Sequence, residues 1–248
     1  MRHSSIEGIA VLTSFAAPLR HAPASAHSAA CGSRLQLQEY INRFPQCLNA
    51  EIERLLPVKA RPVGQHVKWL SPLDSVRYRI SPGVDFLRAA GLSDQPSLLE
   101  NRWSRLGPCW DGVGLFSHVR GGPQGVLLVE AKSRLEELEG SRCRVPAGSM
   151  PVIMETFRET RQWLGALETQ AWTGPLSRMA NRLAHLHLLR NHLDVPAWLV
   201  QIYFLNDPAG PASRADWLPA IAGAQARLGL CQRPPFTLDV FLPALHQR

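Results

Sequence analysis

One segment decides the fold, and it reads Gly-Val-Leu-Leu-Val-Glu-Ala-Lys from Gly125 to Lys132. The glycine is followed by a continuous apolar run, which is typical of a strand that is covered on both faces. Glu130 and Lys132 stand two residues apart, so a strand would point both side chains toward one face of the sheet. Charges at the end of a buried strand cost free energy unless they have partners or bind a metal ion. The segment therefore predicts a central strand that carries a charged site at its end.

A second strand is predicted immediately upstream. The residues from Trp110 to Ser117 favour a strand with Asp111 near its start, and residues 118–125 form a connection rich in Gly and Pro. Two strands joined by so short a connection are expected to pair as an antiparallel hairpin.

The length of that connection decides which side chains meet. If Gly121 and Gly122 are the central residues of the turn, Asp111 faces Lys132 directly and Glu130 lies on the diagonal of the same face. A loop of odd length would turn Asp111 to the other face unless a bulge restored the parity.

This arrangement would suit metal chemistry. The carboxylates of Asp111 and Glu130, with the backbone carbonyl of Ala131, offer the hard oxygen ligands that Mg²⁺ or Mn²⁺ prefers. Lys132 could stabilise charge on a phosphoryl group or orient an attacking water. The alternative is a surface strand end in which Glu130 and Lys132 form an ordinary salt-bridged ladder.

The rest of the chain predicts helices and strands of one α/β domain with a mixed sheet, spanning residues 34–248. Apolar spacing predicts a long helix over Leu35–Leu56, which Pro45 should break or kink. The other expected elements are strands at Gln65–Leu70, Ala197–Leu205 and Phe236–Leu242, and helices at Val84–Ala90, after Ser97, at Met154–Leu167, at Leu176–Leu193 and around Trp217.

Residues 1–33 are low in charge, rich in Ala, Ser and His, and without a sustained period, so we expect a disordered arm. The short apolar run Ile9–Ala17 resembles a secretory signal only in part, because Glu7 lies inside the leader and Thr and Ser interrupt the run.

Charge and cysteine usage limit the class of protein. Lys and Arg exceed Asp and Glu by seven, and the pI is near 9.6, which favours polyanionic partners without naming one. The five cysteines form no CxxC pair and are odd in number, so reduced thiols in a cytoplasmic protein are expected. No apolar run approaches the roughly eighteen residues needed to span a membrane.

Asp111 stands nineteen residues before the Glu130-Ala131-Lys132 triplet on an adjoining predicted strand. This pattern resembles the PD-(D/E)XK phosphodiesterase superfamily, which includes restriction-endonuclease-like enzymes. The stretches similar to a group of uncharacterised bacterial proteins in that superfamily are 107–114, 125–133, 180–185 and 195–199. The resemblance covers about residues 35–207, and its specific part is confined to 107–133 and 180–205.

The resemblance implies an αβββαβ core, dependence on Mg²⁺ or Mn²⁺, and DNA as the usual substrate. It would make Asp111, Glu130 and Lys132 the catalytic residues. Trp110 stands where many members have Pro. Many members also use a Glu on the first core helix as a metal ligand, and Glu100 is the best-placed candidate, although a capping box with Ser97 explains it equally well.

Three further side chains are candidates for substrate contact, namely Gln170, Asn181 and Arg182. Asn181 and Arg182 would lie on the helix that follows the hairpin, where they could face a phosphate. The alternative is that they only flank the apolar stripe of that helix, which begins at Leu183. The histidines at 185, 187 and 192 are not spaced to share one helical face, so we expect no zinc site from them.

These observations together predict a metal-dependent nuclease that acts on DNA. The alternative is a catalytically inactive module on the same fold that binds nucleic acid or another protein. The oligomeric state is left open.

Overall fold

The computed structural model describes residues 32–57, 67–78, 86–87, 103, 107–116, 125–140 and 147–245. Predictions on other residues lie outside this range: the arm up to residue 31, most of the two helices predicted between residues 84 and 106, Glu100 with its capping box, and the turn at 117–124.

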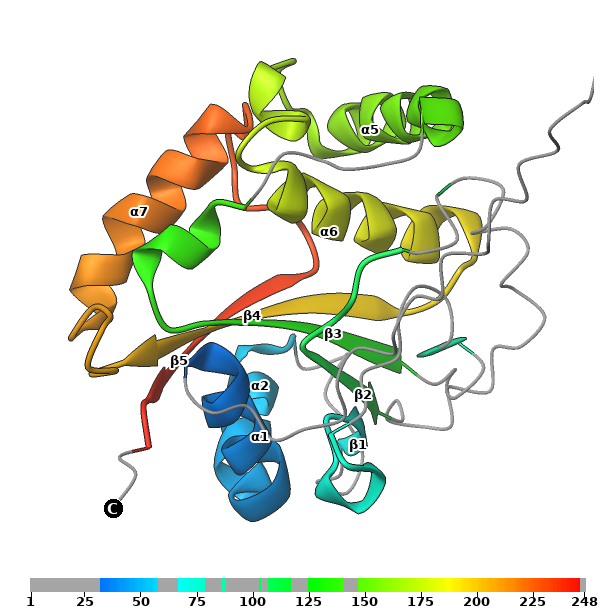
Figure 1. The fold of residues 1–248 in the computed structure, drawn as a ribbon. Coiled ribbons are helices and arrows are strands. Elements are labelled where there is room, and N and C mark those ends of the chain that lie inside the picture. Colours follow the sequence, from blue (N-terminus) through cyan, green and yellow to red (C-terminus); the bar gives the residue numbers. More distant parts are fainter. Residues whose placement is uncertain are drawn as a thin grey trace, which may run out of the picture.

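A five-stranded mixed sheet forms the centre of the molecule, as predicted (Figure 1). The strands lie side by side in chain order, the first three antiparallel and the last three parallel. Their bounds are β1 Lys68–Ser71, β2 Gly112–Phe116, β3 Gly125–Lys132, β4 Ala197–Leu205 and β5 Thr237–Pro243.

Helices cover both faces of the sheet. Figure 1 shows α1 (Ser33–Arg43) and α2 (Pro45–Leu55) below the sheet, and α5 (Met150–Leu164), α6 (Ser177–His187) and α7 (Arg214–Arg227) on the other side. The shorter helical segments are the 3₁₀ turns Asp74–Val76, Leu135–Leu138, Ala147–Ser149 and Gln170–Trp172, and the π-helix Leu188–His192.

The two layers explain why β3 is apolar on both sides. Val126 and Leu128 belong to the core under α5, α6 and α7, whereas Leu127 and Val129 belong to the core under α1 and α2. All eight residues of β3 are buried. The prediction of a central strand is therefore confirmed, and Glu130 and Lys132 continue the row that faces α6.

Pro45 breaks the predicted N-terminal helix into two. Helix α1 ends at Arg43, and Pro45 occupies the first turn of α2, where its missing N–H breaks no hydrogen bond. Helix α1 already begins at Ser33, within the range assigned to the arm.

The hairpin register differs from the predicted one by two residues. Gly112 pairs with Val129 and Phe116 with Gly125, whereas the predicted turn would have paired each β2 residue two positions further along β3. A shift of two preserves parity within the strands. Asp111 itself precedes β2, and its N–H donates to the Val129 carbonyl, so it does not continue the ladder of pairs.

Two helices differ from the sequence prediction in length. Helix α5 begins at Met150, before the predicted Met154, and α7 has fourteen residues, although only a short helix was expected. A capping box between Ser213 and Asp216 begins α7, and the Trp217 ring N–H donates to the Phe204 carbonyl, which holds the helix against β4.

In the described part of the chain, no helix has both the length and the apolar character needed to cross a membrane. The three described cysteines, Cys47, Cys109 and Cys231, are free.

The hairpin gives a test of the fold. A Cβ atom added at Gly125 would lie 2.2 Å from the ring of Phe116, its partner across the strands, so Gly125→Ala should lower the free energy of unfolding by about 1–3 kcal/mol. A Cβ at Gly223 in α7 meets nothing within 4 Å. Because glycine in a helix interior is less stable than alanine, Gly223→Ala should raise the free energy of unfolding by roughly 0.5–1 kcal/mol. Urea denaturation of both variants measures the difference, and equal effects would contradict the close packing of Phe116 on Gly125.

Candidate active site

The structure brings Asp111, Glu130 and Lys132 together at the end of the hairpin. Glu130 and Lys132 are the last charged residues of β3, and Asp111 directly precedes β2. The three residues are only 4%, 2% and 6% exposed. Ionised side chains this deeply buried need compensating partners.

Arg182 on α6 is the main partner of Glu130. Its Nε donates to Glu130 Oε1, and its Nη2 donates to the Cys109 carbonyl over 2.7 Å. The guanidinium also lies over the Trp110 ring, 4.8 Å from the centroid. One side chain therefore joins α6, β3 and the segment that leads into β2.

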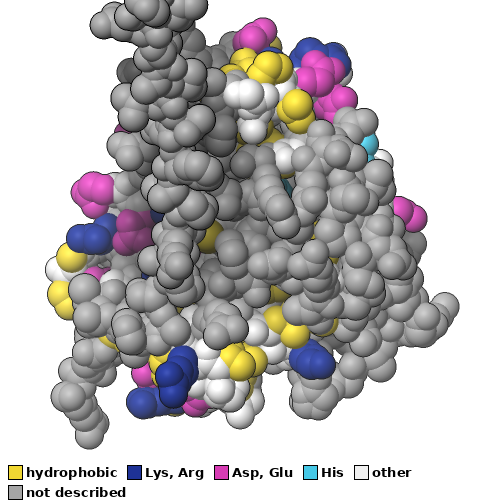
Figure 2. All heavy atoms as spheres, turned by 45° about the vertical axis from the view of Figure 1, so that its right-hand side comes forward, with side chains coloured by type: hydrophobic (Ala, Val, Ile, Leu, Met, Phe, Trp, Pro, Cys, Tyr) yellow, Lys and Arg dark blue, Asp and Glu magenta, His cyan; other side chains and the backbone are white. Residues whose placement is uncertain are grey.

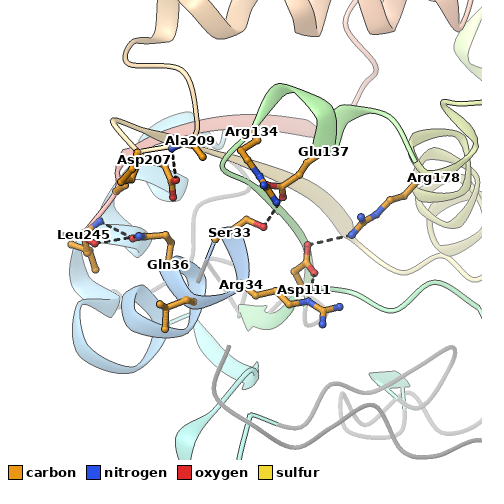
Figure 3. Close-up of a pocket in the computed structure, with 14 residues that line it drawn as sticks. Ser33, Arg34, Gln36, Asp111, Arg134, Glu137, Arg178, Asp207, Ala209 and Leu245 are labelled. Atoms are coloured by element: carbon orange, nitrogen blue, oxygen red, sulfur yellow. Dashed lines mark hydrogen bonds and ion pairs between the residues drawn. The ribbon is translucent and has the colours of Figure 1, made fainter. Parts of the chain in front are cut away.

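Two more arginines reach the carboxylates. Arg178, one turn before Arg182 on α6, places Nη2 3.3 Å from Glu130 Oε2 and 3.8 Å from Asp111 Oδ2. Arg34 on α1 approaches Asp111 from the other side, with 3.6 Å between Nε and Oδ1 (Figure 3). Both carboxylates thus converge on one point, which a single cationic nitrogen occupies.

Backbone contacts fix Asp111 at this point. Its N–H donates to the Val129 carbonyl over 3.0 Å, and its Oδ2 accepts from the Ala131 N–H over 3.1 Å. The N–H and C=O of a strand residue point to the same side of the strand. The Ala131 carbonyl therefore faces the side on which Asp111 lies, while its side chain packs into the core under α1.

The surroundings shift the pKa values of Asp111 and Glu130 in opposite directions. Burial raises the pKa of Asp111, and the charge of Glu130 raises it further, against the effects of Arg178, the Ala131 N–H and Arg182. Burial also acts to raise the pKa of Glu130, but Arg182, Lys132 and Arg178 outweigh it, so this pKa lies below its ordinary value. Glu130 is held as an anion, whereas ionised Asp111 is disfavoured.

Lys132 is buried next to this pair. Burial lowers the pKa of its ammonium group, as do Arg178 and Arg182, and the carboxylates of Glu130 and Asp111 only partly offset that. The neutral amine is therefore easier to form than in water, and a neutral amine can accept a proton.

A cavity opens directly beside Asp111. Its volume is about 730 Å³, and Figure 3 shows Arg34, Arg134 and Arg178 around it with Asp111, Glu137 and Asp207. Helix α1 begins at its wall without a side-chain cap. The Ser33 hydroxyl donates to Glu137 Oε2 over 2.7 Å, which ties the start of α1 to the turn that follows β3.

Sequence reasoning missed several of these residues. Arg178 carried a signal, because it stands four residues before Arg182 on one helix. Gln201, which pairs with Glu130 across the sheet, carried another, as the only polar residue in the β4 sequence before Tyr203. In the register of the parallel strands Glu130, Gln201 and Asp239 form one row across the sheet. Arg34 gave no signal, because its contact depends on how α1 docks.

The three residues that were predicted to contact the substrate lie in different places in the structure. Arg182 enters the site through Glu130, and Asn181 beside it is half-buried with an Oδ1 that has no hydrogen-bond partner among the described residues. Gln170 is exposed at the start of a 3₁₀ turn, next to Thr169, whose hydroxyl donates to the Arg227 carbonyl at the end of α7. No described contact joins Gln170 to the three predicted catalytic residues.

The donor set fits a hard divalent cation. Asp111 and Glu130 supply carboxylate oxygens that already converge on a cation, and the Ala131 carbonyl faces the same side. A metal ion bound here would replace the contacts that Arg178 makes.

Comparison of the chain with protein-family models, with curated proteins and with solved structures finds no match.

The opposite states of the two carboxyl groups can be measured. Glu130→Gln leaves the buried Arg182 without an anion and should lower the free energy of unfolding at neutral pH by about 3 kcal/mol. Asp111→Asn removes a carboxylate whose ionised form is disfavoured and should leave stability unchanged or raise it. Glu155→Gln, which removes a solvent-exposed pair with Arg158, should leave the free energy of unfolding nearly unchanged.

The pH dependence has a definite sign. Because the folded pKa of Glu130 is lowered, its stabilisation is fully present above the ordinary value of 4.5 and is lost as the pH falls through the folded value. Urea denaturation at several pH values should show the protein and Glu130→Gln converging in acid. A larger loss of stability in Asp111→Asn than in Glu130→Gln would contradict the assignment.

Proposed function

We propose that the protein is a metal-dependent phosphodiesterase that cleaves nucleic acid at Asp111, Glu130 and Lys132. One observation carries the proposal: two buried carboxylates and a buried lysine of lowered pKa lie at the end of one hairpin, where Asp111 forms part of the wall of a cavity that three arginines also line. Buried charge clusters of this kind are disfavoured for stability alone, so they favour a functional role.

The order of elements supports a restriction-endonuclease-like core. Helices α1 and α2 precede β1, β2 and β3, then α5 and α6 precede β4. This is the αβββαβ order that the resemblance implies, with the two acids on the second and third strands or directly before them.

The residues divide the chemistry among them. When bound, a Mg²⁺ or Mn²⁺ ion held by Asp111, Glu130 and the Ala131 carbonyl would polarise the phosphate and acidify a bound water. Lys132 would take a proton from the attacking water or stabilise negative charge on the phosphoryl oxygens. Arg178, released from the carboxylates, would bind a phosphate oxygen of the substrate.

Part of the cavity wall suits a polyanionic substrate. Arg34, Arg134 and Arg178 line it beside Asp111, Glu137 and Asp207, so its charged side chains balance, and the uncapped N-terminus of α1 adds backbone N–H groups that favour anions. A divalent cation bound at Asp111 would shift that balance toward positive charge. Charge is also mixed on the surface: Figure 2 shows Lys and Arg next to Asp and Glu around the edges of one face. We therefore place the nucleic acid, by preference DNA, at the cavity, and the cytoplasm remains the expected location.

A second function has one specific observation in its favour. Glu130 is already neutralised by Arg182, and Arg178 bridges both carboxylates. Such a cluster would also suit an inactive module that binds nucleic acid or another protein. That module would bind DNA with a steep salt dependence but would not bind Mg²⁺.

Cleavage assays test the proposal on single- and double-stranded DNA and RNA with Mg²⁺ or Mn²⁺. Lys132→Met should reduce the rate about 10²–10⁴-fold, because it removes the proton acceptor, and Asp111→Asn should abolish metal-dependent cleavage. Glu155→Gln should leave the rate unchanged. Cleavage by all four proteins at one rate would overturn the assignment, and calorimetric Mn²⁺ binding distinguishes an inactive module from an active enzyme.

Arg178 gives a sharper test, because the proposal predicts two opposite effects. Arg178→Ala removes a cation that competes for both carboxylates, so Mn²⁺ should bind more tightly in calorimetry. The same change removes a phosphate contact, so cleavage at saturating metal should fall by at least roughly tenfold. Weaker Mn²⁺ binding in Arg178→Ala would show that the ion does not occupy this point.

A further inference from the structure

A second cluster of ligand-type side chains lies at the other end of α6. His187 is the last residue of α6, and His192 is the last residue of the π-helix that follows. In an α-helix, side chains five residues apart point to different sides, because each residue turns the chain by about 100°. The Leu193 N–H donates to the Leu188 carbonyl over 3.2 Å, which is the five-residue bond of a π-turn.

This wider turn brings the two histidines together. Their ring centroids are 5.3 Å apart, edge to face, and Trp163 packs on His187 with 5.2 Å between centroids. This π-turn ends the helix, as π-turns commonly do, and its consequence is the pair of side chains that it brings together. The spacing argument against a site of three histidines assumed α-helical geometry throughout, and the π-turn brings together only the pair His187 and His192.

Helix α5 supplies the third side chain. Glu159 Oε2 lies 3.1 Å from His192 Nε2, and one ligand atom each from Glu159, His187 and His192 lies within 4.8 Å of the other two. In a tetrahedral zinc site with bonds of about 2.0–2.1 Å, neighbouring ligand atoms are roughly 3.3 Å apart. One pair already has this separation, and a small movement of His187 would complete the set.

A hydrogen bond orients His187. The Thr160 hydroxyl donates to the Thr156 carbonyl over 2.7 Å, so toward His187 Nδ1, 3.3 Å away, it can only accept. His187 therefore carries its proton on Nδ1, and Nε2 has the lone pair. Histidine ligands of metals typically have their other ring nitrogen bound to an acceptor in this way.

His185 is not part of this cluster. Its Nδ1 lies 2.9 Å from the Asn181 carbonyl, its ring packs against Trp103, and burial lowers its pKa to about 3. The set is thus two imidazoles and one carboxylate from two helices.

We propose that Glu159, His187 and His192 bind a Zn²⁺ ion, separately from the Asp111 and Glu130 site. Imidazole and carboxylate ligands suit Zn²⁺ better than Mg²⁺, which prefers oxygen alone. Three protein ligands leave the fourth position of a tetrahedral ion open. Water can reach this position, because the side chains of Glu159 and His192 are 25% and 29% exposed. The ion joins α5 to the end of α6, roughly 14 Å along the helix from Arg178.

Zinc titration of metal-free protein tests the site by calorimetry and by elemental analysis after dialysis. The protein should retain one Zn²⁺ per chain that millimolar Mg²⁺ does not displace. Glu159→Gln and His192→Gln should lose it, because each removes a ligand. Glu155→Gln, on the same helix, and Glu130→Gln, at the other site, should retain it. Thermal unfolding without metal establishes that each variant is folded.

Thr160→Val separates a positioning role from a merely structural one. This nearly isosteric change removes the acceptor for His187 Nδ1 and should weaken zinc binding roughly 10–100-fold. Tetrahedral visible bands of bound Co²⁺ should appear in the protein and disappear in His192→Gln. Equal zinc content in the protein, Glu159→Gln and His192→Gln, or no retained zinc in the protein, would overturn the proposal and leave an ordinary Glu–His hydrogen bond.

Discussion

The buried ion pair between Glu130 and Arg182 is the interaction on which the arrangement of the site depends. Both side chains are almost fully excluded from water, at 3% and 9% exposure, so neither charge is tolerable without the other. Arg182 also binds the Cys109 carbonyl and lies over Trp110. The pair therefore docks α6 onto β3 and onto the chain that enters β2.

That docking sets the chemistry of everything beside it. Once α6 is held by Arg182, Arg178 one turn earlier reaches Glu130 and Asp111 together. The cationic surroundings keep Glu130 ionised, whereas burial lowers the pKa of Lys132 and raises the pKa of Asp111. Ionisable groups whose pKa values are shifted by burial and by specific charge partners cluster at functional sites.

The strands were the part most readily predicted. The apolar run of β3 and the bounds of β4 follow from local composition, because strands buried on both faces select β-branched and apolar residues whatever surrounds them. The hairpin register was predicted two residues away from the observed one. The predicted register followed from the assumed turn residues Gly121 and Gly122. In the observed register Phe116 is paired with Gly125 and its ring packs over that glycine. The two-residue shift preserves parity, and Asp111 and Glu130 both lie near Arg178.

The sequence by itself determined a mixed α/β sheet and predicted that Asp111, Glu130 and Lys132 gather at one end of the hairpin, because strand periodicity is a local property of the chain. Only the tertiary structure brought in Arg34 and Arg178, and only the π-turn brought His187 and His192 to Glu159. These contacts join helices to partners distant in sequence. How helices dock, and where a helix widens by one residue, depends on the packing of the whole core and not on local spacing.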